Sequence, residues 1–166
     1  SGDTLAVLEP TRAPGKAYSA IVKSIGRPEF VFGFGTVDVI FALPVPVMHD
    51  VADSFASATK KLKVDVMIGG TEPVQPIIDF ECDGSGGGLL FRLDGENLLR
   101  LSGEVNAGDR FRIDLQTGRV ELDGSYIGPR IVYTDTDLDV MLRPGPHTIE
   151  TSRTGNITVR WKNQWA

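Results

Sequence analysis

The stretch Arg110-Phe111-Arg112-Ile113-Asp114-Leu115 decides the fold class of this chain. Its apolar residues alternate with charged residues, so the apolar side chains share one face and the charges share the other. Thr117-Gly118 then turns the chain into Val120-Glu121-Leu122, which repeats the alternation. The pattern predicts a β-hairpin with one buried face.

The same pattern continues on both sides of this hairpin. Leu62 to Ile68 alternates upstream, with Lys63 and Asp65 facing water, and Asp94-Gly95 is a tight-turn pair between two apolar runs. Three later strands are expected, at Asp137 to Leu142, His147 to Thr151 and Ile157 to Trp161. Short strands separated by glycine-containing turns at intervals of roughly 8–12 residues are typical of a β-sandwich. The sequence therefore predicts an all-β, antiparallel β-sandwich over residues 60–166.

A partial β segment precedes the sandwich and covers residues 1–52 with its linker. Tyr18 to Val22 and Thr36 to Phe41 are predicted strands, and Pro44-Val45-Pro46 cannot continue a central ladder because two residues lack an N–H. Asp50 to Thr59 is predicted to be a linker with at most one helical turn, since its serines and threonine are weak helix formers.

Composition excludes several classes of function. The 166 residues carry a formal net charge of −5, which disfavours nucleic acid as a partner. Lys60, Lys61 and Lys63 form the densest basic run and are interpreted as a solvated strand edge. No apolar run reaches the roughly 18–20 residues of a membrane span, and we expect no signal peptide.

Metal sites and cofactors are not predicted. His49 and His147 are far apart in the sequence, and His147 follows a Pro-Gly-Pro turn, so a surface turn position is expected for it. Asp135 to Asp139 resembles a calcium loop but lacks the turn glycine and closing glutamate of an EF-hand. It is interpreted as the solvent face of a strand and its lead-in.

Catalytic residues are not predicted either, so the chain is expected not to be an enzyme. Cys82, the single cysteine, lies in an apolar stretch with acidic neighbours and is expected to be a plain buried thiol. Gly84 to Gly88 is interpreted as a flexible turn, and Ser85 within it has neither a nucleophile elbow nor a following helix. Asp114 and Glu121 lie across the predicted hairpin and form a carboxylate pair, but any sandwich offers such pairs by chance. A small β-sandwich hydrolase, which needs two close carboxylates or a metal, is kept as a rival function.

Two tryptophans leave a carbohydrate-binding module open as the main alternative. Trp161 follows the alternation of Ile157 and Val159 and is expected in the core. Trp165 is expected either to be exposed, where it could stack on a sugar ring, or to pack on the sandwich.

A series of short motifs runs through the region from Leu62 to Trp165. In chain order they are Gly69-Gly70-Thr71-Glu72-Pro73 with Pro76 before Ile77-Ile78-Asp79-Phe80, Gly108 to Asp114, Val120 to Gly124, Leu142-Arg143-Pro144-Gly145 with His147, and Val159-Arg160-Trp161 with Trp165. Through these motifs the region resembles the C-terminal domain of siphovirus distal tail proteins, in which asparagine is common at the position of His147. Upstream, Pro14 to Tyr18 resembles a Pro-Gly-Arg-x-Tyr element, and Val37 to Pro46 resembles the last strand of an N-terminal, ring-forming domain.

The resemblance implies a galectin-like, jelly-roll-like sandwich and a structural role in the phage or prophage virion. It implies a ring at the tail tip or baseplate that joins the tail tube to tail-tip proteins and takes part in host adsorption. The protein would be made in the bacterial host cytoplasm, with other tail proteins as partners and no membrane or nucleic acid among them. A homo-hexamer is implied for the full-length protein, whereas the start at Ser1 suggests a processed or excised piece, for which a monomer stays open.

Overall fold

The computed structural model describes residues 5–31 and 33–166, which form two compact units. Ser1, on which the expectation of a processed or excised chain rests, lies outside the described residues. The larger unit runs from Asp53 to Asn163, and the smaller unit combines the residues up to Ala52 with residues 164–166. Residues 53–59 thus group with the sandwich, and the last three residues group with the N-terminal unit.

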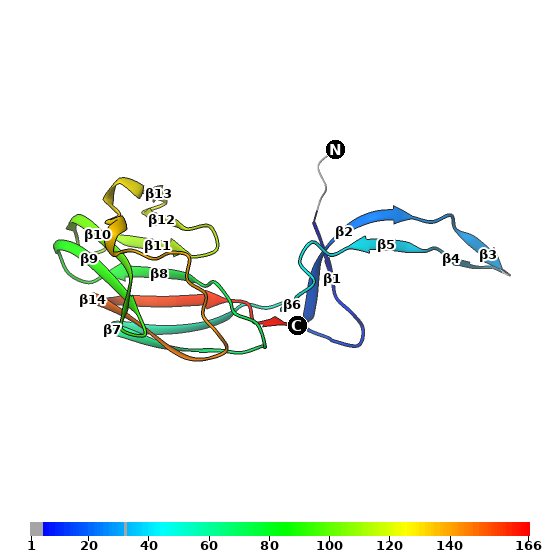
Figure 1. Cartoon of the computed structure of the whole chain (residues 1–166), viewed down its shortest axis with the longest axis horizontal. Helices are drawn as coiled ribbons and strands as arrows, with labels where there is room; N and C mark the ends of the chain where they lie inside the picture. The colour runs from blue at the N-terminus through cyan, green and yellow to red at the C-terminus, as the bar shows by residue number, and fades with distance from the viewer. Residues whose placement is uncertain (1–4, 32) are drawn as a thin grey trace. The chain divides into compact units, whose positions relative to one another are not determined.

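Strands account for almost all regular structure in both units (Figure 1). The N-terminal unit contains β1 Ala6–Leu8, β2 Lys16–Ile25, β3 Glu29–Val31, β4 Phe34–Thr36, β5 Val39–Ala42, β6 Met48–Asp50 and β15 Gln164–Trp165. The larger unit contains β7 Ser54–Ile68, β8 Ile77–Cys82, β9 Gly86–Leu93, β10 Glu96–Val105, β11 Arg110–Asp114, β12 Arg119–Leu122, β13 Ser125–Tyr126 and β14 Gly145–Trp161, with short 3₁₀ turns at Gly128–Arg130 and Tyr133–Asp135. Within the described part of the chain, no helix is long and apolar enough to cross a membrane.

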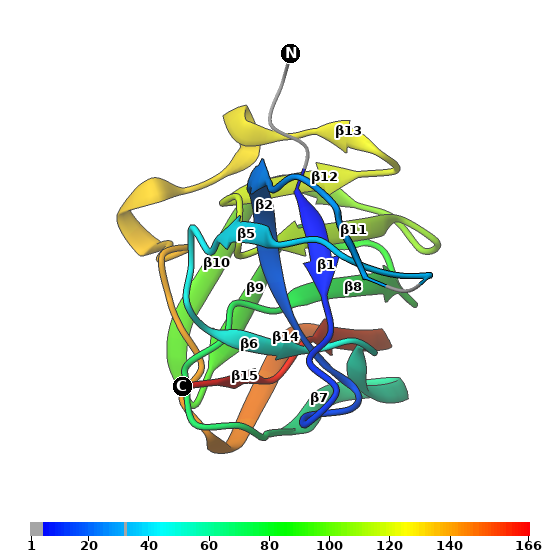
Figure 2. The same ribbon diagram turned by 90° about the vertical axis from the view of Figure 1, so that its right-hand side faces the viewer.

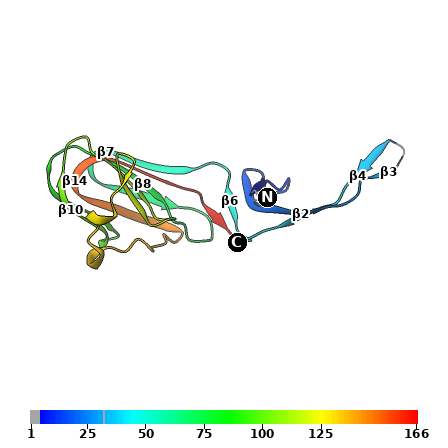
Figure 3. The ribbon, with the colours of Figure 1, turned by 90° about the horizontal axis from the view of Figure 1, so that it is seen from above.

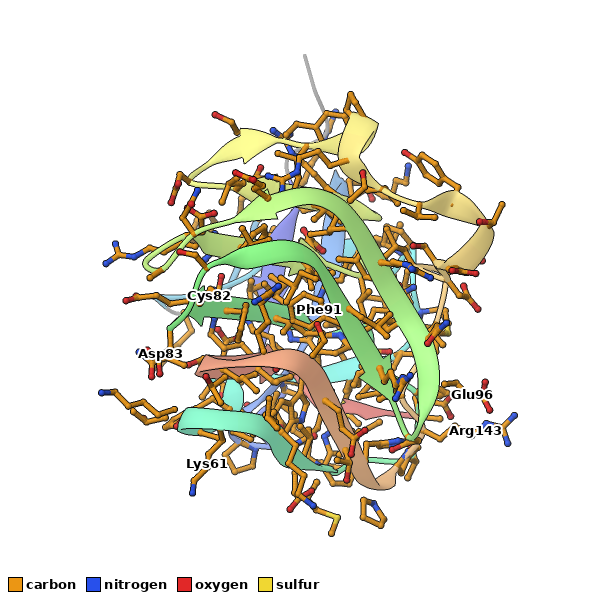
Figure 4. The ribbon with its side chains drawn as sticks, turned by 90° about the vertical axis from the view of Figure 1, so that its left-hand side faces the viewer. Lys61, Cys82, Asp83, Phe91, Glu96 and Arg143 are labelled. Carbon is orange, nitrogen blue, oxygen red and sulfur yellow. The ribbon has the colours of Figure 1, made fainter. Side chains whose placement is uncertain are left out.

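The larger unit is an antiparallel sheet that curls into a sandwich, as the alternation predicted. Its strand order is β10-β9-β14-β8-β11-β12-β13, and β7 pairs with β14; Figure 2 shows β8, β11, β12 and β13 in succession. The first part of β14 pairs with β9 and its last part with β8, so β14 runs through both layers. The rings of Phe80 and Phe91 meet edge-to-face with centroids 5.4 Å apart, and Figure 4 shows Phe91 between the curled strands.

The core is made by the predicted inward faces of the strands. Phe111, Ile113 and Val120 of the deciding hairpin are fully or almost fully buried, and Trp161 is buried as expected. Asp94-Gly95 and Asp123-Gly124 have positive φ at both positions, which is the geometry of type I′ hairpin turns. Leu62 is the exception in its strand: it is half exposed, because the chain bends at Lys60, whose φ is +52°.

Two predictions about secondary structure are wrong. Asp50 to Thr59 is no linker with a helical turn; β6 ends at Asp50 and β7 starts at Ser54, where pairing with β14 overrides weak local preferences. Asp137 to Leu142 is not a strand, because only the backbone of Leu142 is bridged, to Val74. Its apolar residues alternate because Leu138 and Val140 pack on the core, although the segment forms no β-ladder.

Two further predictions are corrected in the same region of the fold. The strands predicted at His147 to Thr151 and Ile157 to Trp161 are one strand, β14, interrupted by register shifts around Gly155. The glycine run Gly84 to Gly88 is not a flexible turn, since β9 begins at Gly86. The Arg153 guanidinium donates hydrogen bonds to the carbonyl oxygens of Ser85, Gly87 and Gly88, which holds this run in place.

The N-terminal unit is a small sheet of order β1-β2-β6-β15, with β5 also paired to β2. The β2–β5 hairpin continues into the β3–β4 pair, which Figure 3 shows at the end of the hairpin remote from β6. Among the described residues of this unit, the buried apolar side chains are those of Ala17 and Ala20. This sheet therefore has almost no core of its own.

Candidate docking surfaces

The candidate metal ligands and nucleophiles do not come together in the structure. The described residues contain no group of three or more His, Cys, Asp or Glu side chains placed to hold a metal ion. Asp135 pairs with Arg100 at 2.7 Å, and Asp137 accepts a hydrogen bond from the N–H of Asp139. Cys82 is buried as expected, and its thiol donates to the Gly84 carbonyl at 3.0 Å.

The serine and the carboxylate pair have structural partners. The Ser85 hydroxyl accepts a hydrogen bond from the N–H of Ala107. Asp114 lies opposite Arg119, and Glu121 lies opposite Arg112, so the two carboxylates do not face each other. Asp114 Oδ1 instead accepts the N–H groups that begin the following turn.

His147 is not a surface turn residue, contrary to the expectation from the sequence. It lies in β14 with its side chain only 15% exposed. Nδ1 is 2.7 Å from Asp94 Oδ2, and Nε2 is 2.7 Å from the carbonyl oxygen of Arg143. Because both ring nitrogens face acceptors, only the imidazolium satisfies both contacts. Burial lowers the pKa of His147, but the bonds to Asp94 and Arg143 and the Asp94 charge outweigh burial and raise the pKa overall.

The outer face of the sandwich carries a ladder of ion pairs beside an open hollow of about 630 Å³. At its centre, Asp79 pairs with Arg112 at 2.8 Å and with Arg160 at 2.6 Å. The hydrogen bond to Asp79 raises the pKa of Arg112. Arg110 pairs with Glu81 at the next position along the strands. These side chains come from the outward positions of β8, β11 and β14, one strand beside the next.

The hollow does not have the aromatic platform that a carbohydrate-binding module needs. Its two aromatic lining residues, Phe80 and Phe111, are buried beneath the charged layer. Trp165 pairs in β15 with the N-terminal unit, where its Nε1 donates to Asp50 at 2.9 Å. The Lys16 ammonium lies 3.4 Å from the centroid of the Trp165 ring and covers one of its faces.

The N-terminal unit exposes the largest set of apolar side chains in the described chain. They occur on and just before β1, on the β2–β5 hairpin, on the β3–β4 pair and on the segments that flank β6. The exposed large apolar residues of this unit are Leu5, Val7, Val22, Ile25, Phe30, Phe34, Val37, Val39, Ile40, Phe41, Leu43, Val45 and Val51. These side chains make the N-terminal unit a candidate docking surface.

Sequence reasoning missed the ion-pair ladder and the contacts of His147. The ladder was detectable in part, because alternation already placed Arg110 and Arg112 on outward positions. Which strands lie side by side depends on register, which the alternation does not contain. The Asp94–His147 pair joins residues 53 positions apart and has no local signal.

Comparisons with known proteins agree with the sandwich fold. A family model described as "Siphovirus-type tail component, C-terminal domain" matches residues 69–165. The crystal structure of the SPP1 Dit (gp 19.1) protein, titled a paradigm of the hub adsorption apparatus in phages infecting Gram-positive bacteria, is similar with a TM-score of 0.78 and 16% identity. The similarity covers 100% of this chain and 67% of the SPP1 chain. No curated protein sequence matches this chain significantly. The chain belongs to the siphovirus-type tail component family, and residues 69–165 carry the C-terminal domain of that family.

Proposed function

We propose that this chain is a distal tail protein that links the tail tube to tail-tip or baseplate proteins and sits at the virion tail tip. Membership of the tail component family supports the class of function. The observation that carries the linking role is the apolar surface of the N-terminal unit. In this proposal, the protein is synthesised in the cytoplasm of the bacterial host. It serves host adsorption and does not catalyse a reaction.

The N-terminal unit is proposed to form the contacts between copies in a ring. Phe34 is 81% exposed and Ile25 69% exposed, so each presents most of its surface to water. Fully burying one such side chain stabilises an assembly by about 1.5–3 kcal/mol. Several of them buried together suffice for a stable interface, and a symmetric homo-hexamer of the complete gene product would bury them repeatedly.

The sandwich is proposed to be the docking part of the subunit. Its strands bury a continuous apolar core within the unit. Its outer face is polar, and the charges on it are already paired, which is typical of surfaces that meet partners without an obligate apolar contact. Modest affinity suffices there, since a ring presents each site several times.

The test compares two substitutions at equally exposed apolar residues. Ile40, on β5 of the N-terminal unit, is 59% exposed, and Met141, on the sandwich, is 58% exposed. Ile40→Asp and Met141→Asp are introduced into the phage or prophage gene, and the protein in purified particles is quantified by immunoblotting. We expect at least a tenfold loss of incorporation for Ile40→Asp and none for Met141→Asp.

Both variants should keep the melting temperature of the parent chain, because neither side chain is buried. Normal incorporation of Ile40→Asp would show that the apolar surface is not a subunit contact. An equal loss for both variants would assign the defect to the charge alone and would also count against the proposal.

A further inference from the structure

β7 is an edge strand of the sandwich, and its outer side is open along its first six residues, Ser54 to Thr59. β7 pairs on one side with β14, and among the described residues no strand pairs with its other side. Ala56 and Ala58 pack on the core but remain half-buried, and Phe55 beside them is 71% exposed. The core is thus incompletely covered at this edge.

The direction of the free backbone groups follows from the ladder. The N–H and carbonyl of Cys82 bond to Asp109 and Gly108, away from β14. Hydrogen-bonded and non-bonded pairs alternate in an antiparallel ladder, so Ile157 and Val159 bond not to β8 but to β7, at Ala58 and Ala56. The N–H of Lys60 also points to β14, where it donates to Asn156 Oδ1.

It follows that Phe55, Ser57 and Thr59 point their N–H and carbonyl groups outward. Each of these residues offers one donor and one acceptor at a spacing that an extended chain matches. Their side chains are all exposed. None of the three is charged, so this part of the edge lacks the side chains that usually prevent strand pairing.

The other edges of the sandwich are protected. The outer side of β10 is covered by the segment after the first 3₁₀ turn: the N–H groups of Val132 and Asp137 donate to the carbonyls of Arg100 and Leu98. β13, at the opposite end of the sheet, has two residues. The contrast singles out β7.

We propose that the outer edge of β7, from Ser54 to Thr59, binds an extended segment of another tail protein as an added strand. The end of that segment that lies beside Lys60 and Lys61 carries carboxylates. Lys60, Lys61 and Lys63 are exposed and form no ion pair within the described residues. Figure 4 shows Lys61 pointing away from the sandwich at the bend of β7. On a chain with a net charge of −5, this local positive patch favours an acidic segment.

A second copy of this chain fits the edge less well. Two β7 edges paired antiparallel about Ser57 would place Lys61 of each copy opposite Asp53 of the other, but Lys60 opposite Ser54. One lysine would gain a carboxylate and the others none. An acidic segment of a different protein offers all of them partners.

The assignment of the occupant to a tail protein rests on the proposed function, whereas the strand-addition site is tested without any tail protein. The probe is a peptide of two glutamates followed by alternating valine and threonine, and its control replaces the glutamates with lysines. Binding to the whole 166-residue chain is measured by fluorescence anisotropy, and amide hydrogen exchange is followed by NMR.

We expect the acidic peptide to bind and to slow exchange at Phe55, Ser57 and Thr59 at least tenfold. Ser57→Pro removes an outward N–H without touching the bonds to β14, so it should weaken binding at least tenfold at an unchanged melting temperature. Ser57→Ala keeps the N–H and should bind like the parent chain. The double substitution Lys60→Glu and Lys61→Glu, which does not alter the strand, should transfer binding to the lysine peptide.

Several results would overturn the inference. They are no peptide binding, binding without slower exchange at those three residues, and equal affinity for both peptides. A dimer of the parent chain in light scattering that Ser57→Pro dissociates would make a second copy the occupant. Failure of the virion-incorporation test would leave these measurements unaffected, so the two proposals fail separately.

Discussion

Asp94→Asn should make the stability of the sandwich less dependent on pH. Asparagine keeps the positive φ that position 94 requires, and one oxygen still accepts the N–H of Thr148 at the geometry seen for Asp94 Oδ1. The substitution removes the charge that faces His147 Nδ1. The neutral imidazole can then donate from Nε2 to Arg143 and accept at Nδ1.

The expected loss is about 1 kcal/mol in mildly acidic solution. A hydrogen bond to a charged group contributes about 1.5–3 kcal/mol when it is shielded from water. The Asp94 side chain is 48% exposed, so solvent screening reduces this contribution toward the range of surface pairs, about 1 kcal/mol or less. That loss corresponds to roughly 4 °C in melting temperature for a domain of this size.

The pH window follows from the two pKa shifts. The pKa of His147 is raised above its ordinary value of 6.5, so its contribution is fully present below pH 6.5 and is lost as pH rises through the higher folded pKa. Burial raises the pKa of Asp94, but the bonds to His147 and Thr148 and the imidazolium charge lower it overall from 3.8. The carboxylate's contribution is therefore present above pH 3.8 and is lost as pH falls through the lower folded pKa.

Urea denaturation of both proteins across this range, together with an NMR titration of the His147 ring, measures the effect. The difference in free energy of unfolding should be largest between the two ordinary values and should shrink in alkaline solution. Parallel curves for the two proteins, or a His147 ring that titrates below its ordinary value, would refute the reasoning.

The remaining predictions concern the core and the glycine-rich strand. Ile113→Asp places an unpaired charge at a position with 0% exposure and should cost several kcal/mol, so loss of the cooperative melting transition is expected, and an unchanged transition would mean that the strand faces the other way. Asp114→Asn should cost less than about 1 kcal/mol in urea denaturation, because the amide oxygen can still accept the turn N–H groups; a larger loss would reveal a role beyond capping. Arg153→Met should speed amide exchange across Gly86 to Gly88 and cost about 1–2 kcal/mol, since three carbonyls lose their donor; protected amides in the variant would argue against this anchoring role.

Alternation and turn chemistry predicted the parts of the fold that depend on neighbours in sequence. The burial of Phe111 and Ile113 and the hairpin turn at Asp94-Gly95 were both predictable. A strand with one solvent-exposed face and a type I′ turn each have a recognisable local sequence pattern. Asp50 to Thr59 was misjudged because its strand exists only through pairing with β14, about a hundred residues away.

The surfaces were less predictable than the core. The contacts of Arg153 and His147 join distant strands and depend on register. The open edge of β7 is a property of the sheet order, since a strand is an edge only by its lack of a second neighbour. The exposure of the apolar surface of the N-terminal unit was equally unpredictable. Alternating valines predict a strand with an apolar face, but they do not indicate whether that face packs within the same chain.

The most direct measurement of the central claim is the mass of the complete gene product in solution, by light scattering after size-exclusion chromatography. A structural tail component whose N-terminal sheet is completed by its neighbours should elute as six copies, and the particles should appear as closed rings by electron microscopy. A stable monomer that stays soluble with this apolar surface in water would contradict the account.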